Sequence, residues 1–337
     1  MMQTKILVDG FGFMGQTHAG NLLKNPQADL IGIIDPCNPV ERLSSIKGNK
    51  ATVTITREEV LDLPHFHSLD EAIAKTRPDA VVIALPTALH YSAVMQCLNA
   101  GIHVFVEKPF AVSLSECRKM VRTAQETRRL LAVGYVVRCM KEYEILKQTV
   151  ASGRLGKLNL LKLNRMTGIP AWGDWKNPDF IKASGGSLFD LVSHDIDFAR
   201  FCLGEPEEIK FANWSNCGQS SVISAAFQYP EMDAAVEGGF VSPSTFPFQR
   251  SFDAFFEKGT LSSHTPGELS EITGQGIQVQ NFSGDNPYYK ETENFIRALQ
   301  TGNIQGICTG EDAMKTIESC TLIARRINYP LPKEIEL

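Results

Sequence analysis

Apolar runs and helical patterns alternate along the first 135 residues. The apolar runs lie at 5–10, 30–35, 79–85, 102–107 and 130–135. A helical pattern lies between each run and the next, at about 14–24, 69–76, 89–100 and 113–128. Continuously apolar runs predict strands that are covered on both faces, as in a parallel sheet. Strand, crossover helix and strand repeated in this order indicate a doubly wound α/β domain.

The pattern changes after about residue 135. Strand-like segments follow at 157–165, 208–214, 222–229, 233–241, 251–258 and 277–282. Several alternate apolar and polar positions, as Phe252, Ala254 and Phe256 do, which is typical of a half-buried antiparallel sheet. We therefore predict a dinucleotide-binding domain over 1–135 and an α+β domain over 136–337, closed by helices at 287–301 and 310–327.

Composition excludes several classes of protein. The 337 residues carry 33 Lys+Arg against 38 Asp+Glu, without a basic run, so we expect no nucleic-acid partner. No apolar stretch reaches the roughly 18–20 residues of a membrane span. The chain opens on a predicted strand without a signal-like segment, and we expect it in the cytoplasm. Its eight cysteines are dispersed, and His65 and His67 lack further ligands, so no metal site is predicted.

A glycine-rich motif follows the first predicted strand and opens the first helix. It consists of Gly10, Phe11, Gly12, Phe13, Met14 and Gly15. Such a turn lets the backbone approach a pyrophosphate at a helix N-terminus. Asp35 ends the second strand, where an acid accepts hydrogen bonds from the adenosine ribose and repels a 2′-phosphate. We predict NAD as the cofactor, and NADP stays open because Arg42 lies nearby.

Lys108 follows the strand predicted at 102–107, at the carboxyl edge where open α/β sheets bind ligands. An ammonium there could stabilise alkoxide character and transfer a proton. Pro109 biases Lys108 away from helical backbone angles. The alternative is a surface lysine paired with Glu107.

A second candidate follows Gly185 and Gly186. The helical pattern there puts Asp190 and His194 at i, i+4, on one helix face. A histidine can take the proton of a substrate hydroxyl, and the carboxylate can orient the ring or bind a second hydroxyl. A solvated helix face is the alternative. Asp197 points to a different face, and we predict only a cap or an ion pair for it.

These motifs resemble the Gfo/Idh/MocA family of oxidoreductases. The matching segments are GFGFMG at 10–15, LPTALH at 85–90, AGIHVFVEKPF at 100–110, GGSLFDLVSHDID at 185–197 and the late helix at 286–303. The resemblance implies a Rossmann domain followed by a domain with a large, open, mainly antiparallel sheet, which binds substrate and forms homodimers or homotetramers.

The resemblance also implies roles for single residues. Lys108 matches the catalytic lysine, Asp190 the substrate-binding acid and His194 the proton-transferring histidine of the family. The remaining matches line the cofactor: Pro86, Thr87, His90 and Glu107.

The activity that the resemblance implies is NAD(P)-dependent hydride transfer at a secondary alcohol of a sugar, cyclitol or related polyol. Trp172 and Trp175 could stack on a sugar ring, although packing is an alternative role. Arg165 could contact an acidic substrate. Two other readings stay open: an NAD-dependent glycosidase of the same family, and a ligand-sensing regulator with the same fold.

Overall fold

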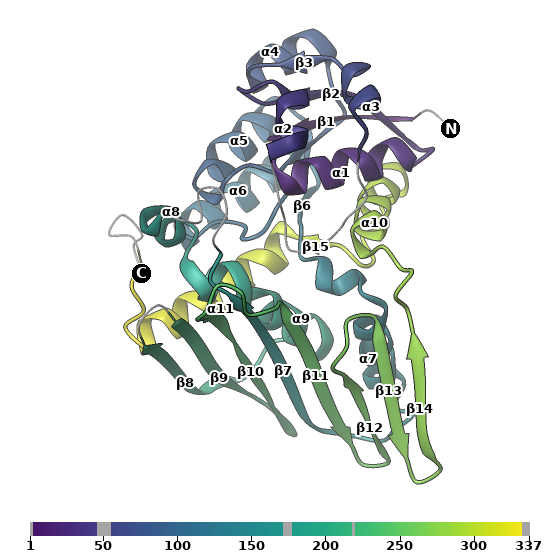
Figure 1. Cartoon of the computed structure of the whole chain (residues 1–337), viewed down its shortest axis with the longest axis vertical. Coiled ribbons are helices and arrows are strands. Elements are labelled where there is room, and N and C mark those ends of the chain that lie inside the picture. The colour runs from purple at the N-terminus through teal and green to yellow at the C-terminus, as the bar shows by residue number, and fades with distance from the viewer. Residues whose placement is uncertain (1–2, 46–54, 171–176, 218–219, 332–337) are drawn as a thin grey trace. The chain divides into compact units, whose positions relative to one another are not determined.

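The computed structural model describes residues 3–45, 55–170, 177–217 and 220–331 (Figure 1). Its contacts divide the chain into two compact units. Unit 1 comprises Met1–Tyr135 and Tyr288–Met314, and unit 2 comprises Val136–Pro287 and Lys315–Leu337. Each unit therefore contains two separate stretches of the chain.

Unit 1 is built on a seven-stranded sheet in the order β15-β6-β5-β4-β1-β2-β3. Its strands are β1 (Thr4–Asp9), β2 (Ala28–Ile34), β3 (His65–Phe66), β4 (Ala80–Ile83), β5 (His103–Val106), β6 (Leu131–Val133) and β15 (Cys308–Thr309). All pairs are parallel except β15 with β6. The strand order reverses direction at β1, so the switch point between β1 and β4 lies where doubly wound folds bind dinucleotides. The predicted doubly wound fold is confirmed.

The strands of unit 1 are buried on both faces, as their apolar runs predict. Ile6, Leu7 and Val8 of β1 are fully buried, and every residue of β4 is buried. The helices of this unit are α1 (Phe13–Lys24), α2 (Pro39–Ser45), α3 (Arg57–Leu61), α4 (Leu69–Thr76), α5 (Thr87–Asn99), α6 (Leu114–Thr127) and α10 (Pro287–Thr301). Helices cover both faces of a parallel sheet because the chain must cross back to the starting end of the sheet before each new strand.

Helix α10, apart from its first residue Pro287, belongs to unit 1, whereas residues 287–301 were predicted to close the second domain. Phe295 and Ile296 are buried in the same core as Val8 and Phe105. The rings of Phe105 and Phe295 meet edge to face at 5.6 Å. The apolar stripe of an amphipathic helix predicts that it covers a core, but does not identify which core.

Unit 2 contains an eight-stranded open sheet in the order β14-β13-β12-β11-β7-β10-β9-β8. Its strands are β7 (Leu158–Gly168), β8 (Glu208–Cys217), β9 (Ser220–Tyr229), β10 (Met232–Val241), β11 (Gln249–Phe256), β12 (Gly259–Ser263), β13 (Glu268–Thr273) and β14 (Gly276–Asn281). Only the β7–β10 pair is parallel among these strands. The predicted mainly antiparallel sheet is confirmed.

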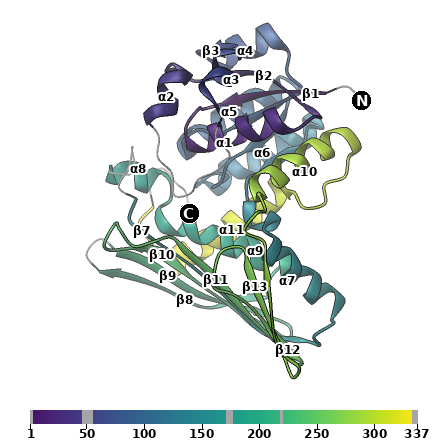
Figure 2. The same ribbon diagram turned by 45° about the vertical axis from the view of Figure 1, so that its right-hand side comes forward.

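Unit 2 also contains six helices or helical turns in the described residues. They are the short helix η1 (Val136–Cys139), α7 (Lys141–Ser152), α8 (Pro178–Ala183), the π-helix η3 (Leu188–Val192), α9 (Ser193–Leu203) and α11 (Gly310–Arg326). The first five residues of α11 belong to unit 1 and the rest to unit 2. Figure 2 shows α7, α9 and α11 on the same side of the strands. Leu161 and Leu163 of β7 are buried toward that side, and Lys162 between them is exposed.

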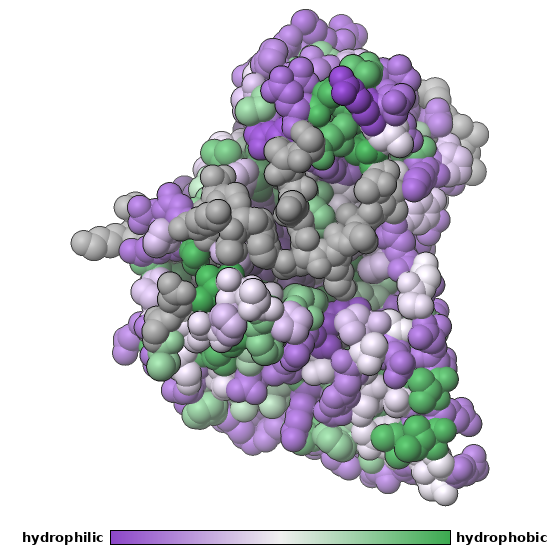
Figure 3. Space-filling model, viewed as in Figure 1, coloured by the Kyte–Doolittle hydropathy of each residue, from purple (hydrophilic) through white to green (hydrophobic). Residues whose placement is uncertain are grey.

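The free edge of the sheet is apolar in places. Strand β14 pairs with β13, and its Ile277 and Val279 are 67% and 58% exposed. Hydrophobic residues also gather along this edge in Figure 3. An exposed apolar edge strand is a surface that proteins commonly cover.

The packing of α10 can be tested with Phe295→Ala. We expect the free energy of unfolding to fall by about 3–5 kcal/mol, because a fully buried aromatic ring is removed from the core of unit 1. Urea denaturation measures this change. Leu299→Ala, at a partly buried position of the same helix, serves as the control and should cost less. A loss below about 1 kcal/mol for Phe295→Ala would contradict the observed packing.

Candidate functional site

The glycine loop of unit 1 is shaped for close approach. Gly10 has φ +90°, and a Cβ there would lie 2.6 Å from the Ala84 carbonyl oxygen. A Cβ on Gly15 would lie 1.9 Å from the Gly10 oxygen, so this packing requires glycine. At Gly12, the N-cap of α1, a Cβ would meet no atom within 4 Å. The open space at this helix N-terminus fits the pyrophosphate of a dinucleotide.

The other members of the motif divide between core and surface. Phe11 is fully buried, so its side chain serves packing and only its backbone can contribute to the loop. Phe13 and Met14 are the first two residues of α1 and are half-buried.

Asp35 holds this loop from the end of β2. Its buried carboxylate accepts hydrogen bonds from the backbone N–H groups of Phe11, at 2.9 Å, and Cys37, at 2.8 Å. The half-buried guanidinium of Arg42 also contacts Asp35, with Nη2 3.2 Å from Oδ1. Nε of Arg42 donates to the same Oδ1 at 3.3 Å, so four contacts surround the carboxylate. Oδ2 receives only the Phe11 N–H among them, and it can still accept a ribose hydroxyl. Arg42 places a positive charge beside the same position.

Asp9 is a buried carboxyl directly before the glycine loop. Burial, and then the neighbouring Asp35 carboxylate, raise the pKa of Asp9 to about 7. The folded protein therefore holds a proton on Asp9 at pH values where the unfolded chain, with a pKa of 3.8, has lost it. The ionisation of Asp9 therefore makes the stability of unit 1, which carries the glycine loop, depend on pH.

The variant Asp9→Asn should reveal this titration. A raised folded pKa means that stability contributed by the neutral form is lost as pH rises from about 4 to about 7. Because Asn cannot ionise, the free energy of unfolding of Asp9→Asn should increase relative to wild type across that interval and level off above it. Denaturation at several pH values measures the difference, with Asp62→Asn at an exposed position as the control. A pH-independent difference would contradict the assignment.

Lys108 follows β5 at the carboxyl edge of the sheet and is half-buried. Its backbone N–H donates to Oε2 of Glu107, at 3.2 Å. The Glu107 carboxylate also lies 2.7 Å from Nε2 of His18, on α1. Glu107 was predicted to line the cofactor. Its carboxylate is buried in unit 1, between the His18 ring and the Lys108 backbone N–H.

His90 connects the loop that follows β4 to the loop that follows β5. Its ring is buried, with Nδ1 3.0 Å from the Pro109 oxygen and Nε2 2.9 Å from the Leu85 oxygen. Burial lowers the pKa of His90. Pro86 and Thr87 lie between these contacts, at the start of α5. His90 thus fixes the predicted cofactor-lining loop from within the unit.

In unit 2, Gly185 and Gly186 turn the chain into the segment that carries Asp190 and His194. They have φ +81° and +61°, and a Cβ on them would lie 2.5 Å from Cβ of Phe189 and 2.4 Å from the Tyr329 hydroxyl. Both positions therefore require glycine. The turn leads directly into η3.

The helix after this turn differs from the predicted one. Asp190 lies in the π-helix η3, and His194 is the second residue of α9, so the two are not spaced as on a continuous α-helix. Asp190 is half-buried and His194 is 8% exposed. π-Helical turns often occur at functional sites, because the extra residue reorients side chains.

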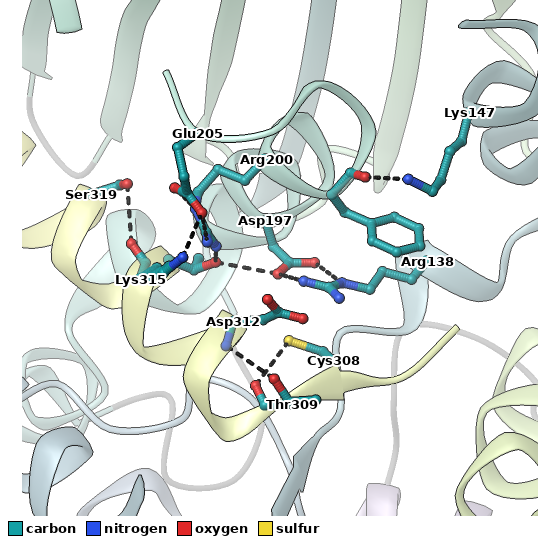
Figure 4. A network of polar contacts seen from close by, with 12 residues as sticks. Arg138, Lys147, Asp197, Arg200, Glu205, Cys308, Thr309, Asp312, Lys315 and Ser319 are labelled. Atoms are coloured by element: carbon teal, nitrogen blue, oxygen red, sulfur yellow. Dashed lines mark hydrogen bonds and ion pairs between the residues drawn. The ribbon is translucent and has the colours of Figure 1, made fainter. Parts of the chain in front are cut away.

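Buried ion pairs hold α9 in place. Arg165 binds Asp195 through two bonds of 2.8 and 2.9 Å, and Arg138 binds Asp197 through two bonds of 2.8 and 2.7 Å. Figure 4 shows the Arg138–Asp197 pair. The hydroxyl of Thr316 also donates to Asp197, at 3.2 Å. The predicted pairing role of Asp197 is confirmed. Arg165, expected to contact an acidic substrate, instead lies inside unit 2 and is paired with Asp195.

Trp172 and Trp175 lie outside the described residues. Among the described residues, no three His, Cys, Asp or Glu side chains form a group that could hold a metal ion.

No helix in the described part of the chain is long and apolar enough to cross a membrane.

Models of one protein family match most of the chain. Residues 4–135 match the Gfo/Idh/MocA oxidoreductase family, NAD-binding Rossmann fold, and residues 143–262 match its C-terminal domain. The chain belongs to this family. The family resemblance and the NAD-binding Rossmann domain predicted from the sequence are thereby confirmed, and the protein is an NAD-binding oxidoreductase.

Individual relatives agree over most of their length. A myo-inositol 2-dehydrogenase of Thermotoga maritima is 25% identical over 323 residues, 91% of each chain. A scyllo-inositol 2-dehydrogenase (NAD(+)) of Bacillus subtilis is 29% identical over 73% of this chain and 69% of its own. An Agrobacterium radiobacter oxidoreductase, solved in complex with NAD+, L-tartaric acid and magnesium, has a TM-score of 0.78 at 18% identity, covering 95% of each chain. This last similarity concerns the fold.

The predicted catalytic residues are distributed over both units. Lys108 belongs to unit 1, and Asp190 and His194 belong to unit 2. His18, which contacts Glu107, was not among the residues predicted from the sequence. The available signal was a histidine three positions after Gly15, in the helical pattern that follows the glycine motif.

Proposed function

We propose that the protein catalyses reversible NAD(P)-dependent hydride transfer at a secondary hydroxyl of a sugar, cyclitol or related polyol. The observation that carries this proposal is the glycine cradle of unit 1, in a sheet whose β5 ends directly before Glu107 and Lys108. The inositol dehydrogenases among the relatives support the substrate class.

Three side chains would act on the substrate. The nicotinamide ring of a bound dinucleotide would accept the hydride. In the oxidation direction, His194 takes the hydroxyl proton, Asp190 orients His194 or binds the substrate, and Lys108 stabilises the developing alkoxide. Histidine suits this step because its ordinary pKa lies near neutral pH.

We propose NAD as the preferred dinucleotide. Among the described residues, Oδ2 of Asp35 accepts only the Phe11 N–H and can also accept a ribose hydroxyl, and the carboxylate would repel a 2′-phosphate. Arg42 contacts the same carboxylate and offers a positive charge, so NADP is the second candidate.

We also propose a homodimer or homotetramer that uses the open sheet of unit 2. The apolar residues along its exposed β14 edge support such an assembly. Location in the cytoplasm stays a prediction from the sequence.

An absorbance screen with NAD and NADP over cyclitols, aldoses and sugar acids tests the proposed activity. For the best substrate, Lys108→Ala and His194→Ala should each lower kcat by about two orders of magnitude, since both groups act on a proton or charge that moves in the transition state. The Kd of the dinucleotide, measured by fluorescence titration, should change little.

Matched controls are Lys258→Ala and His67→Ala, at exposed positions in the two units. Both controls should keep wild-type turnover. Wild-type kcat in Lys108→Ala and His194→Ala would refute the assigned roles, and no dinucleotide reduction or oxidation across the screen would refute the proposed activity.

A further inference from the structure

We propose that His18 is a positioning residue for Lys108 and that it acts through the carboxylate of Glu107. This inference rests on the proposed role of Lys108 in hydride transfer. It assigns a function to a buried contact between α1 and the end of β5, two elements that are far apart in the sequence.

The His18–Glu107 contact is short and shielded from water. Nε2 of His18 lies 2.7 Å from Oε1 of Glu107, and the two side chains are 1% and 8% exposed. A contact of this length is typical of a charge-assisted hydrogen bond. A buried carboxylate that loses such a partner becomes costly to keep in place.

The other oxygen of the same carboxylate reaches the lysine backbone. Oε2 of Glu107 accepts the Lys108 N–H at 3.2 Å. The two oxygens of Glu107 thus connect the His18 ring to the residue that carries the ammonium group. A shift of the carboxylate would therefore change the direction in which Lys108 leaves the strand.

The surroundings leave the Glu107 carboxylate little freedom. A Cβ on Gly134 would lie 3.2 Å from the carboxyl carbon and from both carboxyl oxygens of Glu107. The Glu107 carboxylate therefore packs against the backbone of Gly134. On the other side, the His18 ring meets the Phe105 ring edge to face at 5.1 Å. Phe105 itself is in the core of unit 1. His18 is consequently fixed by packing and can serve as a rigid reference point.

The same helix begins at the glycine loop. His18 lies in the second turn of α1, whose N-cap is Gly12. The contact therefore joins the helix that would hold the pyrophosphate to the segment that presents Lys108. Spacing between cofactor and lysine would be set by one buried hydrogen bond, and errors of about 1 Å in such spacing can cost about 100-fold in rate.

The first test compares His18→Leu with His18→Gln. Leucine leaves Glu107 without the ring nitrogen, and we expect kcat to fall about tenfold or more with an unchanged dinucleotide Kd and an altered pH profile of kcat. Glutamine can present an amide N–H to Glu107, so it should recover most of the lost kcat. His103→Gln, which alters a histidine at the other end of β5, is the control and should leave kcat and its pH profile unchanged.

Glu107→Gln provides a second variant should His18→Leu fail to fold. It preserves the size of the side chain and removes the charge, and we expect the same loss of kcat and the same change in pH profile. Folding of every variant is checked by thermal unfolding. Wild-type kcat and pH profile in a folded His18→Leu or Glu107→Gln would overturn the inference.

The decisive measurement is a double-mutant cycle with Lys108→Ala. If His18 acts through Lys108, His18→Leu should cause no further loss of kcat once the lysine is absent. Independent, multiplying losses would overturn the inference and leave the role of Lys108 intact. Wild-type kcat in Lys108→Ala alone would instead refute the role assigned to Lys108 in the proposed function, so the two failures are distinguishable.

Discussion

The need to provide partners for buried carboxylates organises this protein. A carboxylate removed from water is stable only when hydrogen bonds or an opposite charge compensate for its lost hydration. In unit 1, Asp35 receives two backbone N–H groups of the loops around it, and Glu107 receives one, next to a histidine. In unit 2, Asp195 and Asp197 each receive an arginine. Each of these acids lies within a few residues of a predicted functional group, so charge compensation and placement of the site are achieved by the same contacts.

Glycine provides the complementary constraint, which is space. The loop at Gly10 and Gly15 closes on backbone atoms at distances that exclude any side chain, and the turn at Gly185 and Gly186 does the same against Phe189 and Tyr329. The hydrogen bonds and ion pairs of the buried acids hold these segments in place. The glycines allow the same segments to pack against neighbouring atoms at distances that a side chain would prevent. Gly12 differs from the other four because it borders open space.

Features that depend on local sequence were predictable. Strands buried on both faces require uninterrupted apolar runs, and the glycine motif has its meaning from its position after β1. Features that depend on distant partners were not. The pattern of α10 did not reveal which core it covers, the contact of His18 lies 89 residues away, and Arg165 gave no sign of its pairing with Asp195, 30 residues on. The π-helix was missed because one additional residue per turn hardly alters the periodicity of a five-residue segment.

The discontinuity of unit 1 limits how this chain can be divided or recombined. Phe295 fills a core whose strands are encoded before residue 136, and β15 extends their sheet from residues 308–309. A fragment ending at residue 135 would present an unfilled apolar surface and an uncovered sheet edge. Exchanging cofactor preference between relatives by swapping amino-terminal halves would therefore also require transplanting a matching segment from near the carboxyl terminus.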